Sequence, residues 1–216
     1  MHRQKLLLSL DKYENYWISG EASFGDPDEG WEQFTLNRLR DFVKENKDCF
    51  LRENLAGHVT GSALVTDKSH KYVLLTHHKK LDKWLQLGGH ADGDDDILSV
   101  ALKEASEESG LSALRVVSFM GEKMPFDVDV HKIPERGLEP AHYHYDVRYL
   151  LEGDKDLPLV MSDESKDLRW FSLEEAKALT SEWSMLRQFQ KLEWYGRWHR
   201  SPAFLAKAAD VESRST

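Results

Sequence analysis

The residues best suited to chemistry are carboxylates that crowd into one short stretch. Residues 89–111 contain seven Asp and Glu residues but a single lysine, Lys103. Because Glu104, Glu107 and Glu108 are three and four positions apart, a helix would place them in one stripe where their charges repel. A divalent cation would relieve that repulsion. A cluster whose ligands are all oxygens favours Mg²⁺ or Mn²⁺ over zinc.

Two other interpretations of this acidic stretch have to be weighed. A solvated helix face is the commonest reason for a run of like charges. A calcium-binding loop would take Asp92, Asp94 and Asp96 as its first ligands. That loop is excluded, because Ile97 stands where it needs glycine and Lys103 where it needs glutamate.

The spacing within the stretch resembles the signature of a known family. The sequence Gly89-x5-Asp95-x7-Lys103-Glu104-Ala105-x-Glu107-Glu108-x-Gly110-Leu111 is similar to the Nudix box, Gx5Ex7REUxEExGU, over its whole length. Asp95 replaces the first glutamate and Lys103 replaces the arginine. In the family this pair mostly tethers the loop to the helix, and a shorter acid with lysine lacks the bidentate geometry of arginine.

The resemblance covers residues 56–192 and implies an α/β fold, a Nudix-type α/β/α sandwich with a mixed sheet. It implies a hydrolase that cleaves a diphosphate linkage, usually in a nucleoside diphosphate derivative, by attack of water at phosphorus. Glu104, Glu107 and Glu108 would bind Mg²⁺ or Mn²⁺, with the carbonyl group of Gly89 as a further ligand. The cation would neutralise the phosphates and lower the pKa of a bound water.

Two residues are candidates for the general base. Related domains carry a glutamate in a downstream loop, and Glu164 in Ser162-Asp163-Glu164-Ser165 occupies that place. The alternative for Glu164 is an exposed turn acid with no catalytic role. In that case Glu108, within the box itself, is the candidate base.

A strand with an unusually polar face follows the box. Alternation over 142–149 puts His142, His144, Asp146 and Arg148 on one side and tyrosines on the other. Such a face can bind zinc as a second metal or contact phosphate, with Arg148 bonding two oxygens. The alternative is a half-exposed strand whose tyrosine face forms the core. The same face could include three preceding residues, Asp127, Asp129 and His131.

A basic turn before the box glycines supplies one more candidate for substrate binding. Lys83 belongs to the run Lys79-Lys80-Leu81-Asp82-Lys83, which could meet phosphate. Charge runs more often solvate a turn, and that alternative remains open.

The elements that must position these residues can be predicted from periodicity and capping signals. Amphipathic helices are predicted over 3–17 and 30–46. A hairpin turning at 67–69 comes next, then a helix stopped by Gly110. The remaining predictions are strands over 114–119 and 142–151 and a helix that begins with a capping box at Ser172. The chain is thus divided into an N-terminal helical extension (1–55), a Nudix-type catalytic domain (56–192) and a partly helical C-terminal tail (193–216).

Composition restricts the partners. The 29 Lys and Arg against 38 Asp and Glu give a net charge of −9, which argues against a cationic groove for nucleic acid polymers. No stretch approaches the roughly 18 apolar residues of a membrane helix, so no membrane partner is expected.

The single cysteine, Cys49, excludes an intrachain disulfide and suits a cytoplasmic location. The N-terminal helices are expected either to cover the sheet or to form a homodimer.

The sequence therefore predicts a metal-dependent pyrophosphohydrolase that acts on a small-molecule diphosphate. A Nudix-fold ligand-binding or regulatory protein with little turnover is the alternative, motivated by Asp95 and Lys103. An isomerase of prenyl diphosphates is a third class, but that chemistry typically needs a reactive cysteine. Cys49 lies before the first predicted strand and is poorly placed for it.

Overall fold

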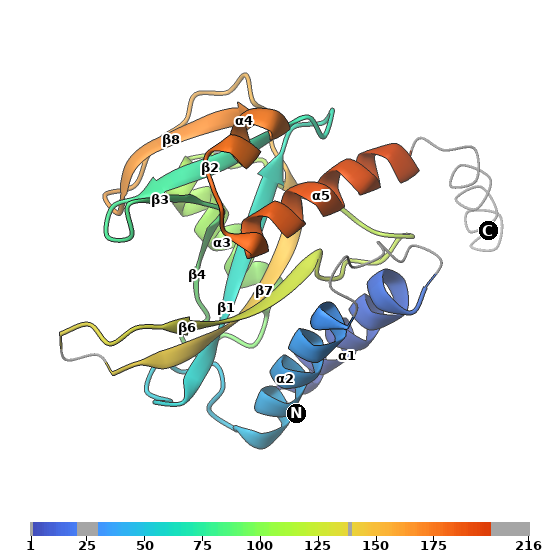
Figure 1. The fold of residues 1–216 in the computed structure, drawn as a ribbon, viewed down its shortest axis with the longest axis vertical. Helices are drawn as coiled ribbons and strands as arrows, with labels where there is room; N and C mark the ends of the chain where they lie inside the picture. Colours follow the sequence, from blue (N-terminus) through green and yellow to red (C-terminus); the bar gives the residue numbers. More distant parts are fainter. Residues whose placement is uncertain (1, 21–29, 138–139, 200–216) are drawn as a thin grey trace.

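A mixed sheet lies between helices at the centre of the molecule (Figure 1). The computed structural model describes residues 2–20, 30–137 and 140–199. Within these residues eight strands form one sheet. The strands are β1 (Gly57–Thr66), β2 (Tyr72–His78), β3 (Lys83–Leu85), β4 (Leu87–His90), β5 (Arg115–Val116), β6 (Asp127–Ile133), β7 (His142–Glu152) and β8 (Ser165–Ser172). The helices are α1 (Gln4–Tyr13), which continues into a π-helical turn (Glu14–Ile18), α2 (Trp31–Glu45), α3 (Ile97–Ser109), α4 (Leu173–Ala178) and α5 (Trp183–Trp198).

Strand β1 is the central strand, and all ten of its residues are buried. One edge of β1 pairs in parallel with β7 along its whole length. The other edge is shared, with β4 beside Thr60–Ala63 and β2 beside Val65 and Thr66. Beyond β7 the sheet continues with β6, and beyond β2 with β8. This topology brings the box glycines of β4 and the polar face of β7 to the two edges of one strand.

Helices cover both faces of the sheet, which confirms the predicted sandwich. A Cβ atom on Gly61 of β1 would lie 2.9 Å from the carbonyl oxygen of Ile97, so this face packs against α3. The neighbouring Ser62 pairs with Arg148 and points to the other face. There Arg148 Nη1 donates to the carbonyl oxygen of Ser184 in α5 at 3.2 Å.

The N-terminal helices belong to the same hydrophobic core as the sheet. Leu10 and Tyr13 of α1 and Leu36 of α2 are fully buried in that core. Phe42 of α2 stacks on Tyr145 of β7 with 3.8 Å between the ring centroids. Figure 1 shows α1 and α2 side by side below the sheet. Of the two roles predicted for these helices, the structure shows them covering the sheet.

The predicted helices and the hairpin agree with the structure, whereas one predicted strand is shorter than expected and several strands were not predicted. The hairpin is confirmed by the pairing of Val65 with Leu74, and the capping box by hydrogen bonds between Ser172 and Glu175. The strand predicted over 114–119 is reduced to Arg115–Val116. Strand β4 lies in a stretch whose glycines were expected to form a loop, and its pairing with β1 overrides their low strand propensity. Strands β3, β6 and β8 were not predicted either.

The C-terminal helix α5 continues past the predicted domain boundary at 192 to Trp198. Positions 200–216 of the predicted tail lie outside the described residues. Across the described parts of the chain, no helix combines the length and the apolar character needed to cross a membrane.

Candidate active site

Helix α3 presents the three glutamates of the acidic stretch to a cleft. The side chain of Asp96 accepts a hydrogen bond from the backbone of Ser99 and caps the start of α3. Gly110 ends the helix with φ at 72°, a left-handed conformation that glycine adopts without strain. Ala101 and Ala105 are fully buried against the sheet. The next stripe of the helix surface carries Glu104, Glu107 and Glu108, which line the cleft.

The glycines of β4 allow two of these carboxylates to pack directly against the strand. A Cβ atom on Gly89 would lie 2.5 Å from both Cδ and Oε2 of Glu104. The backbone N–H of Gly88 donates to Oε2 of Glu108 at 3.2 Å. The box therefore needs glycine here so that strand backbone and helix carboxylates can meet.

Replacing Gly89 with alanine should impair the site and leave the fold intact. The new methyl group must displace the Glu104 carboxylate, which is the end of a flexible side chain. Because misplacing a functional group by about 1 Å can cost about 100-fold in rate, we expect kcat to fall about 10- to 100-fold. Steady-state kinetics and thermal unfolding of the Gly89→Ala variant test this. Unchanged kcat would show that the position of Glu104 is unimportant, and a collapsed Tm would show that Gly89 is needed for folding.

Two carboxyl groups of the acidic cluster, those of Glu104 and Glu108, have raised pKa values. Burial is the main reason that the pKa of Glu104 is raised. Burial, opposed by the Gly88 hydrogen bond and reinforced by Glu104 and Glu164, raises the pKa of Glu108 to about 7. Glu107 is more open, with 63% of its side chain exposed and Lys103 Nζ 4.0 Å away. Both half-buried acids therefore resist ionisation, and a cation bound beside them would favour their charged forms.

The cleft, about 520 Å³ in volume, brings together most of the predicted site residues. Its lining includes Gly89, the three glutamates of α3, Glu164, His144 and Asp146. Three predicted substrate contacts are not part of this lining. Lys83 is exposed and forms an ion pair with Glu182, His142 is buried behind His144, and Arg148 lies beneath the surface.

Arg148 is held in a buried ion cluster that we define by its carboxylates, Asp127, Asp129 and Asp146. Its guanidinium donates to Asp146 at 2.7 Å, to Asp127 at 3.1 Å and to Asp129 at 3.2 Å. Asp146 also accepts hydrogen bonds from Thr60 and Ser62 of β1 at 2.9 and 2.7 Å. Nothing in this position supports phosphate binding by Arg148, and the geometry gives it the role of orienting Asp146. The polar face of β7 is therefore divided: His144 and Asp146 line the cleft, whereas His142 and Arg148 are buried.

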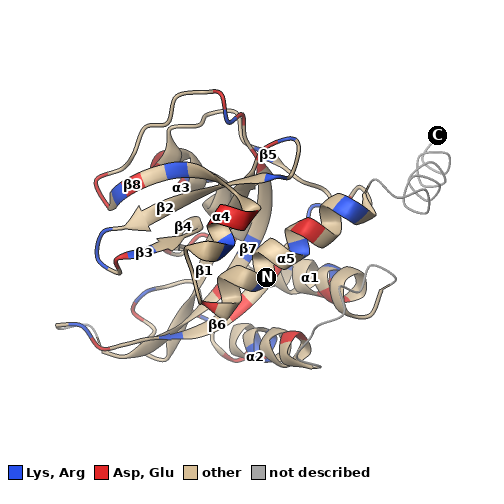
Figure 2. Cartoon of the chain, turned by 45° about the horizontal axis from the view of Figure 1, so that its top comes forward, with Lys and Arg blue, Asp and Glu red and all other residues tan. Residues whose placement is uncertain are grey.

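The ion cluster extends to both ends of the described chain. Arg187 of α5 donates to Asp127 at 2.7 Å, and Lys191 of the same helix lies 3.1 Å from Asp127. Lys191 also pairs with Glu32 of α2 and donates to the hydroxyl of Tyr13 in α1 at 2.7 Å. Figure 2 colours the charged residues on these elements. Residues from four separate segments thus neutralise one another inside the protein.

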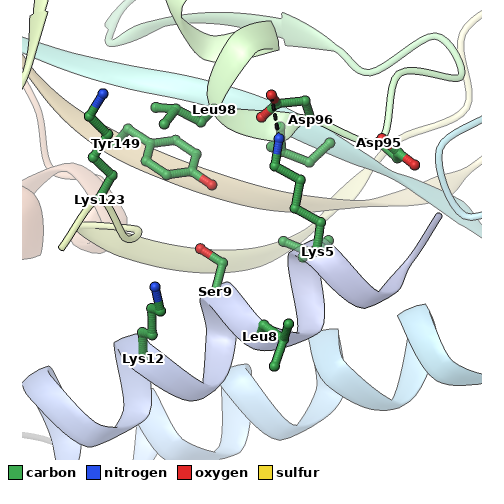
Figure 3. Close-up of a pocket in the computed structure, with 11 residues that line it drawn as sticks. Lys5, Leu8, Ser9, Lys12, Asp95, Asp96, Leu98, Lys123 and Tyr149 are labelled. Carbon is green, nitrogen blue, oxygen red and sulfur yellow. Dashed lines mark ion pairs between the residues drawn. The ribbon is translucent and has the colours of Figure 1, made fainter. Parts of the chain in front are cut away.

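The loop before α3 is anchored by residues that the sequence did not single out. Lys103 lies by Glu107 rather than in a fork with Asp95. Arg52 instead donates to both carboxylate oxygens of Asp92 at 2.5 and 2.8 Å. Lys5 of α1 lies 2.5 Å from Asp96 (Figure 3). The N-terminal segment therefore supplies ion pairs on both sides of Asp95.

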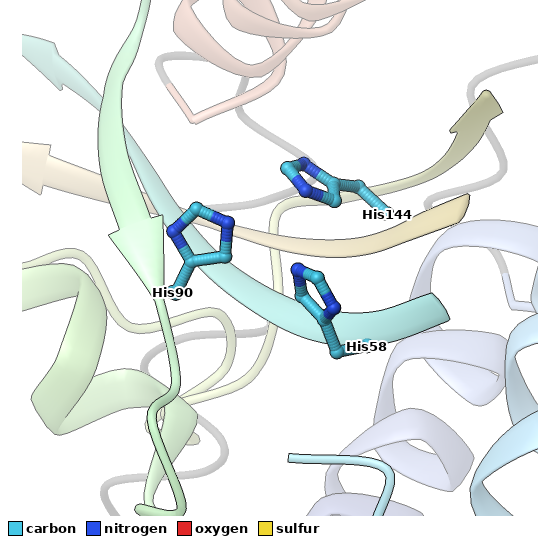
Figure 4. Close-up of side chains that lie close together, drawn as sticks. All are labelled: His58, His90 and His144. Atoms are coloured by element: carbon cyan, nitrogen blue, oxygen red, sulfur yellow. The ribbon is translucent and has the colours of Figure 1, made fainter. Parts of the chain in front are cut away.

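Histidines from three strands meet beside the acidic cluster. His58 of β1, His90 of β4 and His144 of β7 point toward one another (Figure 4). Burial, followed by neighbouring His90 and His142, lowers the pKa of His58 to about 4. Of these three histidines, only His144 could be singled out from the sequence as a possible metal ligand. Finding His58 would have required knowing that β1 lies between β4 and β7.

The fold and the acidic cleft define a class of protein, the hydrolases of phosphorus anhydrides built on a mixed sheet. A sequence model of the NUDIX domain matches residues 57–192, and the chain belongs to the Nudix family. It is a Nudix-type pyrophosphohydrolase.

Several known proteins are similar to parts of this chain. A NUDIX-family hydrolase structure from Clostridium perfringens is 25% identical with a TM-score of 0.50, covering 63% of this chain and 96% of that one. The asymmetrical bis(5'-nucleosyl)-tetraphosphatase of Rattus norvegicus is 24% identical over 123 residues, 57% of this chain and 74% of the relative. An Ap4A hydrolase binary complex from C. elegans, 18% identical with a TM-score of 0.50 over 69% of this chain and 98% of that one, shows the shared fold.

Proposed function

We propose that the protein cleaves a phosphorus anhydride in a nucleoside diphosphate derivative or a related compound, using Mg²⁺ or Mn²⁺. The observation that carries this proposal is the meeting of four glutamates in one cleft. Three of them come from α3, and the fourth, Glu164, comes from the turn before β8. The raised pKa of Glu108 supports a cluster built around a cation.

The donor set fits a hard divalent cation. Glu104, Glu107 and Glu108 offer only oxygen atoms, and the glycine at 89 leaves room for the Glu104 carboxylate against the strand. These three side chains and the Gly89 carbonyl group would hold the ion. When bound, Mg²⁺ or Mn²⁺ neutralises charge on the phosphates and makes an attacking water more acidic.

Glu164 is the proposed general base. It lines the cleft, and its carboxylate is close enough to Glu104 and Glu108 to raise the pKa of both. Its turn is fixed at the backbone, where the N–H of Lys79 donates to the carbonyl oxygen of Glu164 at 3.0 Å. Lys79 Nζ also donates to the carbonyl oxygen of Asp163 at 2.9 Å. An exposed carboxylate on such a fixed turn can accept a proton from water that attacks phosphorus.

Replacing Glu164 with glutamine should lower kcat about 100- to 10,000-fold, the usual contribution of a general base. Affinity for Mn²⁺ and the Tm should change little, because Glu164 is exposed. Asp163→Asn is the matched control, since Asp163 is an exposed acid in the same turn and does not line the cleft. If the Glu164→Gln variant retains the kcat of the wild type, the base is Glu108 instead.

Dinucleoside polyphosphates are the first substrates to test, because of the similarity to the rat tetraphosphatase. Nucleoside diphosphate sugars, nucleoside triphosphates and coenzyme diphosphates complete the screen. Released phosphate or nucleoside monophosphate is measured with Mg²⁺ and with Mn²⁺. If no compound is cleaved although Mn²⁺ binding saturates, the protein is a binding or regulatory member of the family and the proposed activity is wrong.

A further inference from the structure

Half of the ten histidines in the sequence gather on one face of the sheet. His58 is opposite His144 across β1 and β7, and His131 is opposite His144 across β7 and β6. Thr60, two positions after His58 and on the same face, is opposite His90 of β4. His142 also lies on this face, with its Nε2 3.3 Å from Nε2 of His144. The register of four neighbouring strands therefore produces the cluster.

Three members of the cluster converge on one point. One ring nitrogen from each of His58, His90 and His144 lies within 4.8 Å of the other two (Figure 4). His58 is only 2% exposed, and neither of its ring nitrogens has a hydrogen-bond partner among the described residues. Leaving a buried polar group without a partner costs stability, so the retention of His58 here calls for a ligand.

We propose that His58, His90 and His144 form a binding site for a zinc ion, distinct from the carboxylate site on α3. Neutral imidazole nitrogens are the donors that zinc accepts, whereas Mg²⁺ and Mn²⁺ prefer oxygen. Zinc holds nitrogen ligands at about 2.0–2.1 Å in a tetrahedron, which puts ligand atoms about 3.4 Å apart. Zinc binding therefore requires the three ring nitrogens, now within 4.8 Å of one another, to move closer together.

The site is open toward the cleft on one side. His90 and His144 line the cleft, whereas His58 lies beneath them. Three protein ligands leave the fourth position of a tetrahedral ion facing the cleft, as in zinc sites that exchange ligands. That position can take water or an oxygen atom of a molecule in the cleft. Beside it, Nδ1 of His131 lies 2.9 Å from Asp129, which connects the histidines to the ion cluster.

Metal binding by the purified full-length chain tests the proposal. Zinc is titrated against a chromophoric chelator, and Co²⁺ is used as a spectroscopic probe. The expected result is one tightly bound zinc per chain, with a visible Co²⁺ spectrum typical of a four-coordinate ion held by three histidine nitrogens and one further ligand. The His90→Asn variant should bind zinc more than about 100-fold more weakly, because loss of even an outer partner costs about 10- to 100-fold.

Two control variants make the outcome decisive. His78→Asn removes a histidine that lines the cleft outside the cluster and should leave zinc affinity unchanged. Glu108→Gln should keep zinc binding and lose Mn²⁺ binding, which separates this site from the one used in the proposed function. Thermal unfolding of each variant confirms that it is folded. Absence of stoichiometric zinc binding in the wild type, or wild-type affinity in His90→Asn, would overturn the proposal.

Discussion

Glu108→Gln should lower the metal-dependent kcat by about 1,000-fold or more, the equivalent of the several kcal/mol that a metal ion contributes to such a transition state. Glutamine keeps the size of the side chain and can still accept the hydrogen bond from the N–H of Gly88. It loses the negative charge that would hold the proposed cation. Steady-state kinetics with Mg²⁺ and Mn²⁺ measure the effect.

The thermal stability of the Glu108→Gln variant shows whether Glu108 serves metal binding or folding. Because burial raises the pKa of Glu108 to about 7, its ionised form costs stability in the metal-free protein above that pH. The metal-free variant should therefore unfold at pH 8 at a Tm no lower than the wild type. Mn²⁺ at 100 times its Kd should add about 2.7 kcal/mol to the stability of the wild type and little to that of the variant. Glu174→Gln, on the exposed surface of α4, is the control. Wild-type turnover in Glu108→Gln would show that the carboxylates of α3 are not the metal site.

Asp127→Asn should cost about 3–5 kcal/mol of unfolding free energy, the effect of removing one partner from a buried ion pair. Asp127 is fully buried and contacts Arg148, Arg187 and Lys191. Burial alone would raise the pKa of Asp127, but these cations outweigh it and hold the pKa below its usual value. Without the carboxylate, three buried cations lose their shared counter-charge. Urea unfolding at neutral pH measures the loss.

An exposed ion pair provides the comparison for Asp127. Asp156→Asn breaks the pair with Lys155, in which 81% of the Asp156 side chain is exposed, and should cost no more than about 1 kcal/mol. If Asp127→Asn costs no more than Asp156→Asn, the buried cluster makes no special contribution to stability.

Local signals were sufficient where a segment determines its own structure. Helix α3 could be predicted because its acidic stripe, its N-cap and Gly110 all lie within 15 residues of one another. The same is true of the capping box at Ser172 and of the hairpin between β1 and β2. The meeting of Glu164 with Glu104 and Glu108 was reached through the family resemblance, since the two segments are far apart in the sequence.

What could not be predicted depends on packing between distant segments. The face of β7 that carries Arg148 has the same alternation as a solvent-exposed strand, and only the placement of α5 buries it. Strand β4, which contains Gly88 and Gly89, forms because part of one edge of β1 is available for it to pair with. Lys5 and Arg52 become tethers because α1 and the segment after α2 lie against the loop before α3. None of these relations leaves a periodic pattern in the sequence.

The buried ion cluster also bears on how the chain folds as it is synthesised. Asp127 and its partner Arg187 are separated by 60 residues, and Glu32 and Lys191 by 159. A ribosome therefore makes the strands of the sheet and both N-terminal helices before any of the α5 cations exist. Until α5 emerges, Asp127, Asp129 and Asp146 share Arg148 as their cation, and the cluster carries unbalanced negative charge. Of the helices in the described residues, α5 is the last to be synthesised, and its cations complete the charge balance of the earlier segments.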